Sequence, residues 1–529
     1  MPRTRIPDWL LITAVCTFFF LWALASIGLI GADEPRYAQV AREMLTRHDW
    51  VTPVLSGSPW LEKPPLYYWQ AMIAYKVFGI SDWAARLPSA VDGFILVFAV
   101  YWFLRRFRPG LELDAALMLA SAAGIAGYAR AASMDLPLAA TFTIAMLSWY
   151  AWFESGSRAY LAAFYAFLAI AMLAKGPVAP ALAAVIVAIF AAVERSDQLA
   201  WKTIVRKTLW LPGIILFYAL GLPWYVMVQL RNPQFFHEFI IEHNLARFST
   251  NLYHHPEPFW YYVPVTLLAW VPWSVFAAVA CVWTARRLRN RDADGLSAFL
   301  LIWIAVTVTF FSISQSKLPG YILPAIPPGT ILLSQYVRAR FGAKPRPATT
   351  ALHAALGGAL IFSALMVPYL ALRHPLPWGT TIIAPLILSA TIAAAVFVSL
   401  HKYGYPNLRF ITLVPAVLAV GIAVRQGAPS LDLALSARPA AAALQQLDPH
   451  HLPLAVFLVS RETEVGLQFY RNQTFPRYER GEIPDAEHLV VAPEGREQEV
   501  SARALNRKVT YLGSFAPQKL DFFYVTAKQ

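Results

Sequence analysis

Acidic and basic side chains with the chemistry of a group-transfer site stand at the ends of long apolar runs. Asp33 and Glu34 follow the first apolar run directly, and Asp135 opens a later one. Lys63 comes shortly after the first acids, and Lys175 lies between two further apolar runs. Charged residues beside a membrane span cost free energy and usually persist because they have a function. Such carboxylates can act as general bases, and such lysines can pair with a phosphate.

The segment 31–65 carries two of these charged clusters. One is the run Asp33-Glu34-Pro35-Arg36-Tyr37, and the other is Glu62-Lys63-Pro64-Pro65. Prolines in both clusters and many interspersed aromatic residues are typical of a rigid, amphipathic segment on a bilayer surface. A solvated extramembrane loop is the alternative. We expect this segment to form the floor of an active site.

A set of cations is predicted to lie on the same membrane face as these acids. A lipid-linked phosphate needs a cation at the membrane interface while its apolar tail remains in the bilayer. Tyr321, in the run Ser316 to Pro324, is an aromatic neighbour of this set. Each cation taken alone could instead be an interfacial anchor. The candidates are Lys63, Lys175, Arg247 and Lys317.

The segment 236–248 has helical spacing. His243 and Arg247 are four residues apart and share one predicted helix face with Phe239. Histidine and glutamate are zinc ligands, but their spacing here matches no standard zinc motif. A structural helix at the membrane interface is the alternative.

Composition indicates a polytopic membrane protein. Of 529 residues, 58% are hydrophobic and only 14% are charged, and the mean hydropathy is +0.48. The net charge of +13 comes from short Lys and Arg clusters between apolar runs, which membrane topology explains better than a nucleic-acid partner. Both cysteines lie inside apolar runs, so a disulfide framework and a Cys-based metal site are excluded.

The apolar runs predict about thirteen transmembrane helices. Six basic clusters then fall on one side, which the positive-inside rule makes cytoplasmic. The acids fall on the opposite face, which in a bacterium is the periplasmic side of the inner membrane. The first run resembles a signal peptide, but it is as long as a full span, so we expect a retained helix. The runs are 9–30, 86–104, 114–130, 136–153, 159–174, 177–193, 209–230, 259–284, 297–313, 320–337, 351–371, 379–399 and 409–426.

The chain divides near residue 430 by composition. Residues 1–429 form the predicted transmembrane domain, with 31–85 as its first periplasmic loop carrying juxtamembrane helices. Residues 430–529 have no run of spanning length and are predicted to form a small periplasmic α/β domain. Strands are expected at 454–460, 488–492, 509–512 and 522–526, and a helix at 463–472. No glycine-rich phosphate loop follows the first strand, so a nucleotide-binding role has no support.

Three motifs resemble those of a known family. They are Asp33 to Tyr37, the run Leu61 to Trp69 (LEKPPLYYW) and the run Lys317 to Pro324 (KLPGYILP). They are similar to the bacterial aminoarabinose (4-amino-4-deoxy-L-arabinose) transferases of lipid A, in the GT-C superfamily with the protein O-mannosyltransferases. The resemblance covers most of the membrane part. It implies thirteen transmembrane helices, periplasmic juxtamembrane helices and a periplasmic C-terminal domain.

The resemblance also implies residue roles. Asp33 would be the catalytic acidic residue, supported by Arg36 and Tyr37, with Asp135 as a second functional carboxylate. Gly320 stands where the family usually has a histidine after Lys-Leu-Pro. Contacts to the phosphate of the undecaprenyl donor are implied for Lys63, Arg247 and Tyr321. The full predicted substrate-binding set also contains Glu34, Arg36, Tyr37, Lys175 and Lys317. A zinc ion is implied at Glu62 and His243.

These features predict an inverting glycosyltransferase that uses a polyprenyl-phosphate sugar. The most specific form moves 4-amino-4-deoxy-L-arabinose from undecaprenyl phosphate to a phosphate of lipid A. The same chemistry with another sugar or acceptor, such as mannosyl transfer to protein, is the alternative. A transporter or flippase would need charges in mid-span and repeated halves, and neither is visible. A purely structural anchor leaves the clustered acids unexplained.

Overall fold

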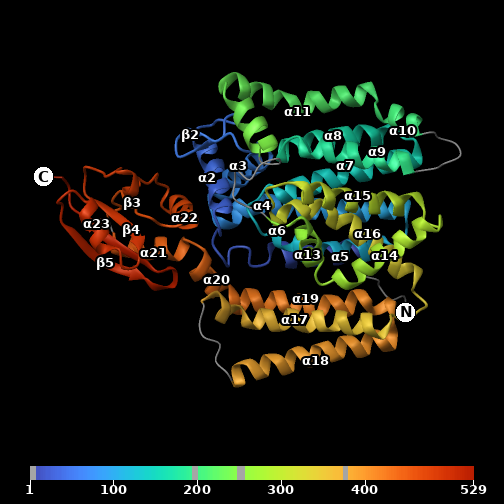
Figure 1. Cartoon of the computed structure of the whole chain (residues 1–529). Helices are drawn as coiled ribbons and strands as arrows, with labels where there is room; N and C mark the ends of the chain where they lie inside the picture. The colour runs from blue at the N-terminus through green and yellow to red at the C-terminus, as the bar shows by residue number, and fades with distance from the viewer. Residues whose placement is uncertain (1–6, 194–200, 247–256, 373–378, 449, 529) are drawn as a thin grey trace.

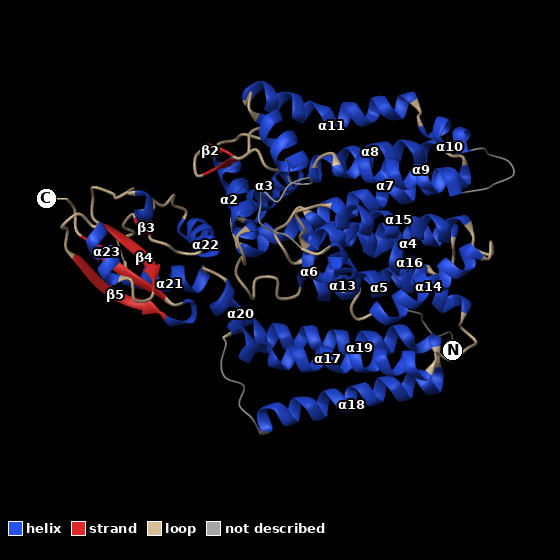
Figure 2. Cartoon of the chain, in the orientation of Figure 1, coloured by secondary structure: helices blue, strands red, loops and turns tan. Residues whose placement is uncertain are grey.

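The computed structural model describes residues 7–193, 201–246, 257–372, 379–448 and 450–528. Helices form one large bundle up to about residue 435, and a small α/β unit follows at one end of the bundle (Figure 1). Figure 2 shows that the strands lie in this C-terminal unit, apart from a short hairpin near α2 and α3. The fold is therefore the predicted helical membrane protein with a small C-terminal sheet domain.

The helices of the bundle lie roughly side by side, and most of their axes are roughly aligned (Figure 1). Their bounds are α1 (Asp8–Cys16), α4 (Asp82–Phe107), α5 (Glu112–Ser121), α6 (Ala123–Ala129), α7 (Asp135–Ser155), α8 (Arg158–Lys175), α9 (Val178–Val193), α10 (Trp201–Thr208), α11 (Leu211–Arg231), α13 (Tyr262–Ala269), α14 (Ser274–Arg289), α15 (Gly295–Ile313), α16 (Ile326–Ala339), α17 (Pro347–Ala371), α18 (Thr380–Tyr403), α19 (Leu408–Ile422) and α20 (Ala428–Leu435). Short π and 3₁₀ segments join them, among them η2 (Phe236–Ala246) and η4 (Pro319–Ala325).

Eight described helices are long and apolar enough to cross a membrane, and one bent pair brings the number to nine. The bent pair runs from Phe259 to Arg289 and turns by 117° at its break. Another predicted run, 114–130, is divided into α5 and α6 because Ala122 is extended, with ψ near 128°. The multi-pass architecture is confirmed, whereas the count of thirteen spans stays a prediction.

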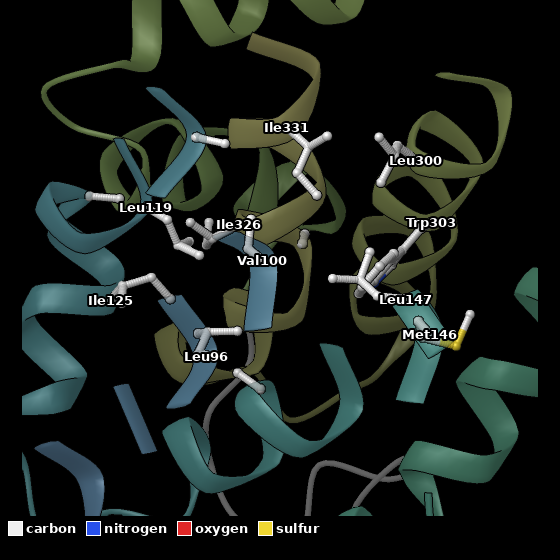
Figure 3. Close-up of a cluster of buried hydrophobic side chains, with 14 of the residues drawn as sticks. Leu96, Val100, Leu119, Ile125, Met146, Leu147, Leu300, Trp303, Ile326 and Ile331 are labelled. Carbon is white, nitrogen blue, oxygen red and sulfur yellow. The ribbon is translucent and has the colours of Figure 1, made fainter. Parts of the chain in front are cut away.

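Large apolar side chains and small residues together fill the middle of the bundle. Figure 3 shows side chains from α4, α5, α7, α15 and α16 meeting there, with Trp303 among them. Alanines such as Ala115 and Ala116 on α5 are fully buried and allow the helices to approach closely. Van der Waals packing of this kind holds helices together where lipid removes the hydrophobic driving force. A rigid core therefore supports the helix ends.

The first loop folds into two helices with a hairpin between them. These are α2 (Asp33–Thr46), strands β1 (Val54–Leu55) and β2 (Ser58–Pro59), and α3 (Leu66–Phe78). Tyr37 of α2 packs against Tyr67 and Tyr68 of α3, with ring centroids 6.3 and 6.4 Å apart. Both α3 tyrosines are fully buried. The loop is therefore a packed platform and not a tether.

The C-terminal unit is a four-stranded sheet with helices. Its elements are α21 (Arg438–Leu447), β3 (Leu454–Val456), α22 (Arg461–Arg471), β4 (His488–Pro493), α23 (Glu497–Arg503), β5 (Val509–Phe515) and β6 (Leu520–Val525). The strand order is β3-β4-β6-β5; β3 is parallel to β4, and the other pairs are antiparallel. All four predicted strands and the predicted helix are present. The predicted boundary at residue 430 falls inside α20, so the domain limits stay a prediction.

The C-terminal unit is fastened to the first loop by polar contacts. Arg42 on α2 donates to the backbone carbonyl of Phe469 at 2.7 Å. Tyr470 donates to Asp82 at 2.9 Å, and Arg438 pairs with the same carboxylate at 2.8 Å. The unit therefore fixes α2, the helix that begins with Asp33.

Candidate active site

Two adjoining cavities lie where the first loop meets the ends of the bundle helices. The larger has a volume of about 380 Å³ and is mainly apolar. The smaller has a volume of about 50 Å³, and its lining includes Asp33 and Asp135. The two cavities share four lining residues, which we call the shared wall: Glu62, Lys63, Lys175 and Tyr321.

The ends of two helices bring Asp135 and Lys175 together. Asp135 begins α7, and Lys175 ends α8. Helix dipoles favour a negative charge at the start of a helix, as at Asp135, and a positive charge at its end, as at Lys175. The two side chains form an ion pair, and the Ser133 hydroxyl donates to Asp135 at 2.7 Å. The Lys175 ammonium also lies 4.2 Å from the centroid of the Tyr321 ring, so this cation is held from two sides.

The first turn of α2 presents Asp33 and Arg36 to the small cavity. They form an ion pair one helical turn apart, in which the Asp33 side chain is 53% exposed and the Arg36 side chain only 8%. The Arg36 guanidinium lies 5.0 Å from the ring centroid of Trp60 and 5.3 Å from that of Tyr37. Burial raises the pKa of Tyr37, with the Asp33 charge adding to the effect, so its hydroxyl stays protonated. Asp33 is therefore the accessible carboxylate of this group.

Glu34 lines neither cavity and is turned into the protein. Its carboxylate binds Arg86 of α4 at 2.6 and 3.0 Å, and both residues are buried. It also accepts hydrogen bonds from the backbone N–H groups of Ile30 at 2.8 Å and Ala132 at 2.7 Å. Its substrate-binding role stays a prediction, and these contacts support a positioning role. Sequence reasoning missed Arg86, although a lone arginine at the start of an apolar run signals a buried partner.

The larger cavity is lined mostly by apolar side chains from several elements. The lining includes Leu138, Val178, Phe239, Phe310 and Phe311. Ligand pockets of several hundred Å³ with apolar walls and few polar groups are typical small-molecule sites. With charged residues gathered in the shared wall, the cavity suits a molecule with an apolar tail and an anionic end.

Glu62 and His243 lie side by side at this cavity, as the resemblance implies. The Glu62 carboxylate and His243 Nε2 are 3.9 Å apart, and both side chains are largely buried. A protein zinc site needs three or four ligands. Across the residues that the structure describes, no group of three His, Cys, Asp or Glu side chains is placed to hold a metal. The residues present do not complete a zinc site.

The two remaining cations of the predicted set are Lys317 and Arg247. Lys317 is buried, donates to the backbone carbonyl of Glu257 at 2.9 Å and lines neither cavity, although Ser316 and Leu318 on either side of it do. Arg247 lies outside the described residues. Their substrate-binding roles stay predictions.

A glycine sets how closely η4 approaches the site. A Cβ atom added at Gly320 would lie 2.7 Å from both Asp135 Cγ and the Tyr128 hydroxyl. Real Cβ atoms essentially never come that close to another heavy atom. Sequence reasoning noted Gly320 as a departure from the family motif but missed Tyr128. The space of the absent side chain is filled here by a carboxylate and a phenol.

Comparisons with known proteins show which proteins this chain is similar to. The family model of dolichyl-phosphate-mannose-protein mannosyltransferases matches residues 11–239. An undecaprenyl phosphate-alpha-4-amino-4-deoxy-L-arabinose arabinosyl transferase of Erwinia tasmaniensis is 28% identical over 87% of this chain and 82% of its own length. The corresponding protein of Pseudomonas aeruginosa is 30% identical over 62% of this chain and 59% of its own length. The chain is therefore similar to aminoarabinose transferases over most of its length.

A solved structure extends the likeness over the whole fold. The crystal structure of ArnT from Cupriavidus metallidurans bound to undecaprenyl phosphate covers 98% of this chain and 97% of its own, with a TM-score of 0.77. The sequence identity is 20%, so this match concerns the fold. It includes the C-terminal unit, for which the sequence offered no family motif. The predicted resemblance and the predicted fold class are confirmed.

Proposed function

We propose that this chain is an integral-membrane glycosyltransferase that moves 4-amino-4-deoxy-L-arabinose from undecaprenyl phosphate to a phosphate of lipid A. One observation carries the proposal: an apolar cavity and a small cavity lined by three carboxylates share a wall that contains two lysines. The relatives named for this sugar transfer support the choice of donor. The chain spans about three fifths of the length of several of these relatives and about four fifths of others.

The larger cavity takes the isoprenoid tail of the donor next to its phosphate. Its aromatic and aliphatic lining removes apolar surface from water or lipid without placing polar groups against the tail. The donor phosphate then lies at the shared wall, where Lys63 and Lys175 supply positive charge and Tyr321 supplies a hydroxyl. The sugar end of the donor faces Asp33 in the small cavity.

The reaction is a displacement at the anomeric carbon. An oxygen of the acceptor phosphate forms a bond to that carbon, and the bond from the carbon to the donor phosphate oxygen breaks. The bonding electron pair remains on the released undecaprenyl phosphate, whose charge Lys63 and Lys175 stabilise. Attack opposite the leaving phosphate inverts the anomeric centre.

Asp33 acts on the acceptor. An anionic phosphate acceptor needs no strong base. The Arg36 guanidinium pairs with it, and the Asp33 carboxylate positions that guanidinium and so orients the acceptor. For a hydroxyl acceptor, Asp33 would take the proton, which contributes about 10²–10⁴-fold in rate. Asp135 holds Lys175 in the shared wall and so acts as a positioning residue. No step passes through a metal at Glu62 and His243.

The site belongs on the periplasmic face of a bacterial inner membrane in this proposal. The basic loops lie at the opposite ends of the same helices, and positive loops remain in the cytoplasm. Residues 1–429 then form the transferase domain with 31–85 as its first periplasmic loop, and 430–529 form the periplasmic domain.

The test uses the full-length protein in membrane vesicles with a defined undecaprenyl-phosphate aminoarabinose donor and lipid A. Transfer is measured by mass spectrometry of lipid A. Asp33→Asn and Lys63→Ala are expected to abolish the mass gain, while Lys76→Ala, an exposed lysine on α3, leaves it unchanged. Full transfer by either active-site variant, with normal amounts of folded protein, would remove the proposed mechanism.

A second acceptor class has its own support. The matching family model is described for mannosyl transfer to protein, and it covers both the first loop and the Asp135–Lys175 pair. Supplying a polyprenyl-phosphate mannose donor and a peptide in the same vesicles tests this alternative. Mannosylated peptide together with an unchanged lipid A mass would favour it.

A further inference from the structure

A third cavity lies at the opposite end of the bundle from the candidate active site. It has a volume of about 390 Å³ and is built from α14, α16, the segment after α16, the beginning of α17, and the short 3₁₀ segment η5 (Tyr405–Asn407) before α19. Tyr321, in η4 just before α16, lines the active site, whereas Tyr336 and Arg340 at the other end of α16 line this cavity. The fourteen residues of α16 span about 21 Å, so the two cavities are separate.

Four cations line this cavity, and no carboxylate does among its described lining residues. They are Arg286 on α14 and Arg340, Lys344 and Arg346 around the connection from α16 to α17. None of the four makes an ion pair in the part of the chain that the structure describes. By contrast Arg287, the next residue on α14, pairs with Asp292 at 3.2 Å.

Four like charges around one cavity repel each other, and a bound anion relieves that repulsion. Membrane topology accounts for basic residues in such a loop, but it does not require them to converge on one cavity from different elements. A counter-ion with more than one oxygen can contact several of these cations at once. The charge pattern therefore indicates an anionic ligand with a phosphate-like group.

The wall beside the cations is apolar and follows one helix. Ala278, Val282 and Arg286 are spaced four residues apart on α14 and line the cavity in that order. Val282 is 52% exposed in the isolated chain, on a helix of the membrane bundle. Trp283 lines the same cavity one residue further, and tryptophan favours the level of the lipid headgroups. A ligand here meets cations at one end and a lipid-facing apolar stripe at the other.

We propose that this cavity binds the headgroup of an anionic phospholipid, with an acyl chain along the Ala278–Val282 stripe of α14. Basic pockets between transmembrane helices bind acidic lipid headgroups. A small phosphate-containing solute shares the headgroup chemistry but has nothing to place on the apolar stripe. The inference does not depend on the proposed transfer reaction.

The experiment measures lipid binding to the full-length protein in detergent by native mass spectrometry. Dioleoyl phosphatidylglycerol is the anionic probe, dioleoyl phosphatidylcholine the neutral one and inorganic phosphate the solute. The double variant Arg286→Gln/Arg340→Gln removes two lining cations. The matched control Arg289→Gln/Arg338→Gln removes two cations from the same two helices outside the cavity.

We expect the lining variant to bind phosphatidylglycerol about 30-fold more weakly, since each interfacial cation contributes about fivefold. The single variant Arg340→Gln should then lose about fivefold. The matched control and phosphatidylcholine binding should change by less than about twofold. These residues are exposed, and a melting temperature within about 2 °C of the parent shows that the variants are folded.

Three outcomes overturn the proposal. Equal losses in the lining variant and the matched control would mean a diffuse positive surface without a site. Unchanged binding in the lining variant would place the lipid elsewhere. Inorganic phosphate that binds as tightly as phosphatidylglycerol and displaces it would identify a solute site and exclude the phospholipid.

Discussion

The substitution Gly320→Ala tests how the approach of η4 to Asp135 supports activity. The added Cβ would lie 2.7 Å from Asp135 Cγ, whereas ordinary van der Waals contact begins near 3.4 Å. The carboxylate or η4 must therefore move by about 0.7 Å, since the missing distance cannot be compressed. Gly320 has an ordinary negative φ, so alanine introduces no backbone strain of its own.

The expected effect is larger on activity than on folding. Overpacking of one methyl group costs about 1–3 kcal/mol of stability. A displacement near 1 Å in a catalytic arrangement costs about 100-fold in rate, so we expect kcat/KM to fall about 10- to 100-fold. The assay is the initial rate of sugar transfer in vesicles, with the melting temperature measured on the same preparations.

Two companion variants test whether the loss of rate in Gly320→Ala comes from the contact with Asp135. Gly127→Ala, on α6 beside Tyr128, places its Cβ in open space and should leave the rate unchanged. If Gly320→Ala acts through Asp135, it should add little to the loss already caused by Asp135→Asn. Two results would refute the reasoning. One is a normal rate in the Gly320→Ala protein. The other is a double variant, Gly320→Ala with Asp135→Asn, whose fold-loss equals the product of the two single losses.

Three further predictions concern the stability of the protein and the docking of its C-terminal unit. Glu34→Ala leaves Arg86 buried without its partner and should destabilise the protein by about 3–5 kcal/mol in denaturation experiments, whereas Glu499→Ala at an exposed surface pair should change little. Arg438→Gln removes contacts to Asp82 and Asp432, so hydrogen exchange should rise in α21 and α22; unchanged protection would contradict the docking role. Burial lowers the pKa of His488 below its ordinary value of 6.5, because the folded protein favours the neutral side chain. This group therefore leaves the free energy of unfolding at its full value above pH 6.5 and reduces it as the pH falls below 6.5. The protection of β4 amides in the intact chain, measured relative to the intrinsic exchange rate at each pH, should therefore fall at acidic pH, and His488→Gln should remove that dependence.

The sequence predicted those parts of the site that depend on helix ends. Apolar runs located α7 and α8, so Asp135 and Lys175 were expected at their termini, on one face. The same reasoning placed Asp33 and Lys63 on that face, and the structure brings them to one small cavity. Membrane topology was sufficient for these residues because it fixes the face on which helix ends and the loops between them lie.

Side-chain direction could not be predicted in the same way. Asp33 and Glu34 are adjacent, but one faces the cavity and the other binds Arg86, since successive helical residues point about 100° apart. Lys317 lies between two lining residues and still turns away to the carbonyl of Glu257. These outcomes depend on partners that are distant in sequence, which spacing alone does not reveal.

The shared wall has a consequence for inhibitor design. Glu62, Lys63, Lys175 and Tyr321 border both compartments, so one molecule can occupy both only by crossing that border. Such a compound needs an apolar group for the larger cavity, a compact hydrogen-bonding group for the smaller cavity and an acidic linker at the shared wall. In the proposed mechanism the linker would contact the groups that stabilise the released carrier, so escape mutations there would reduce activity as well as binding of the compound.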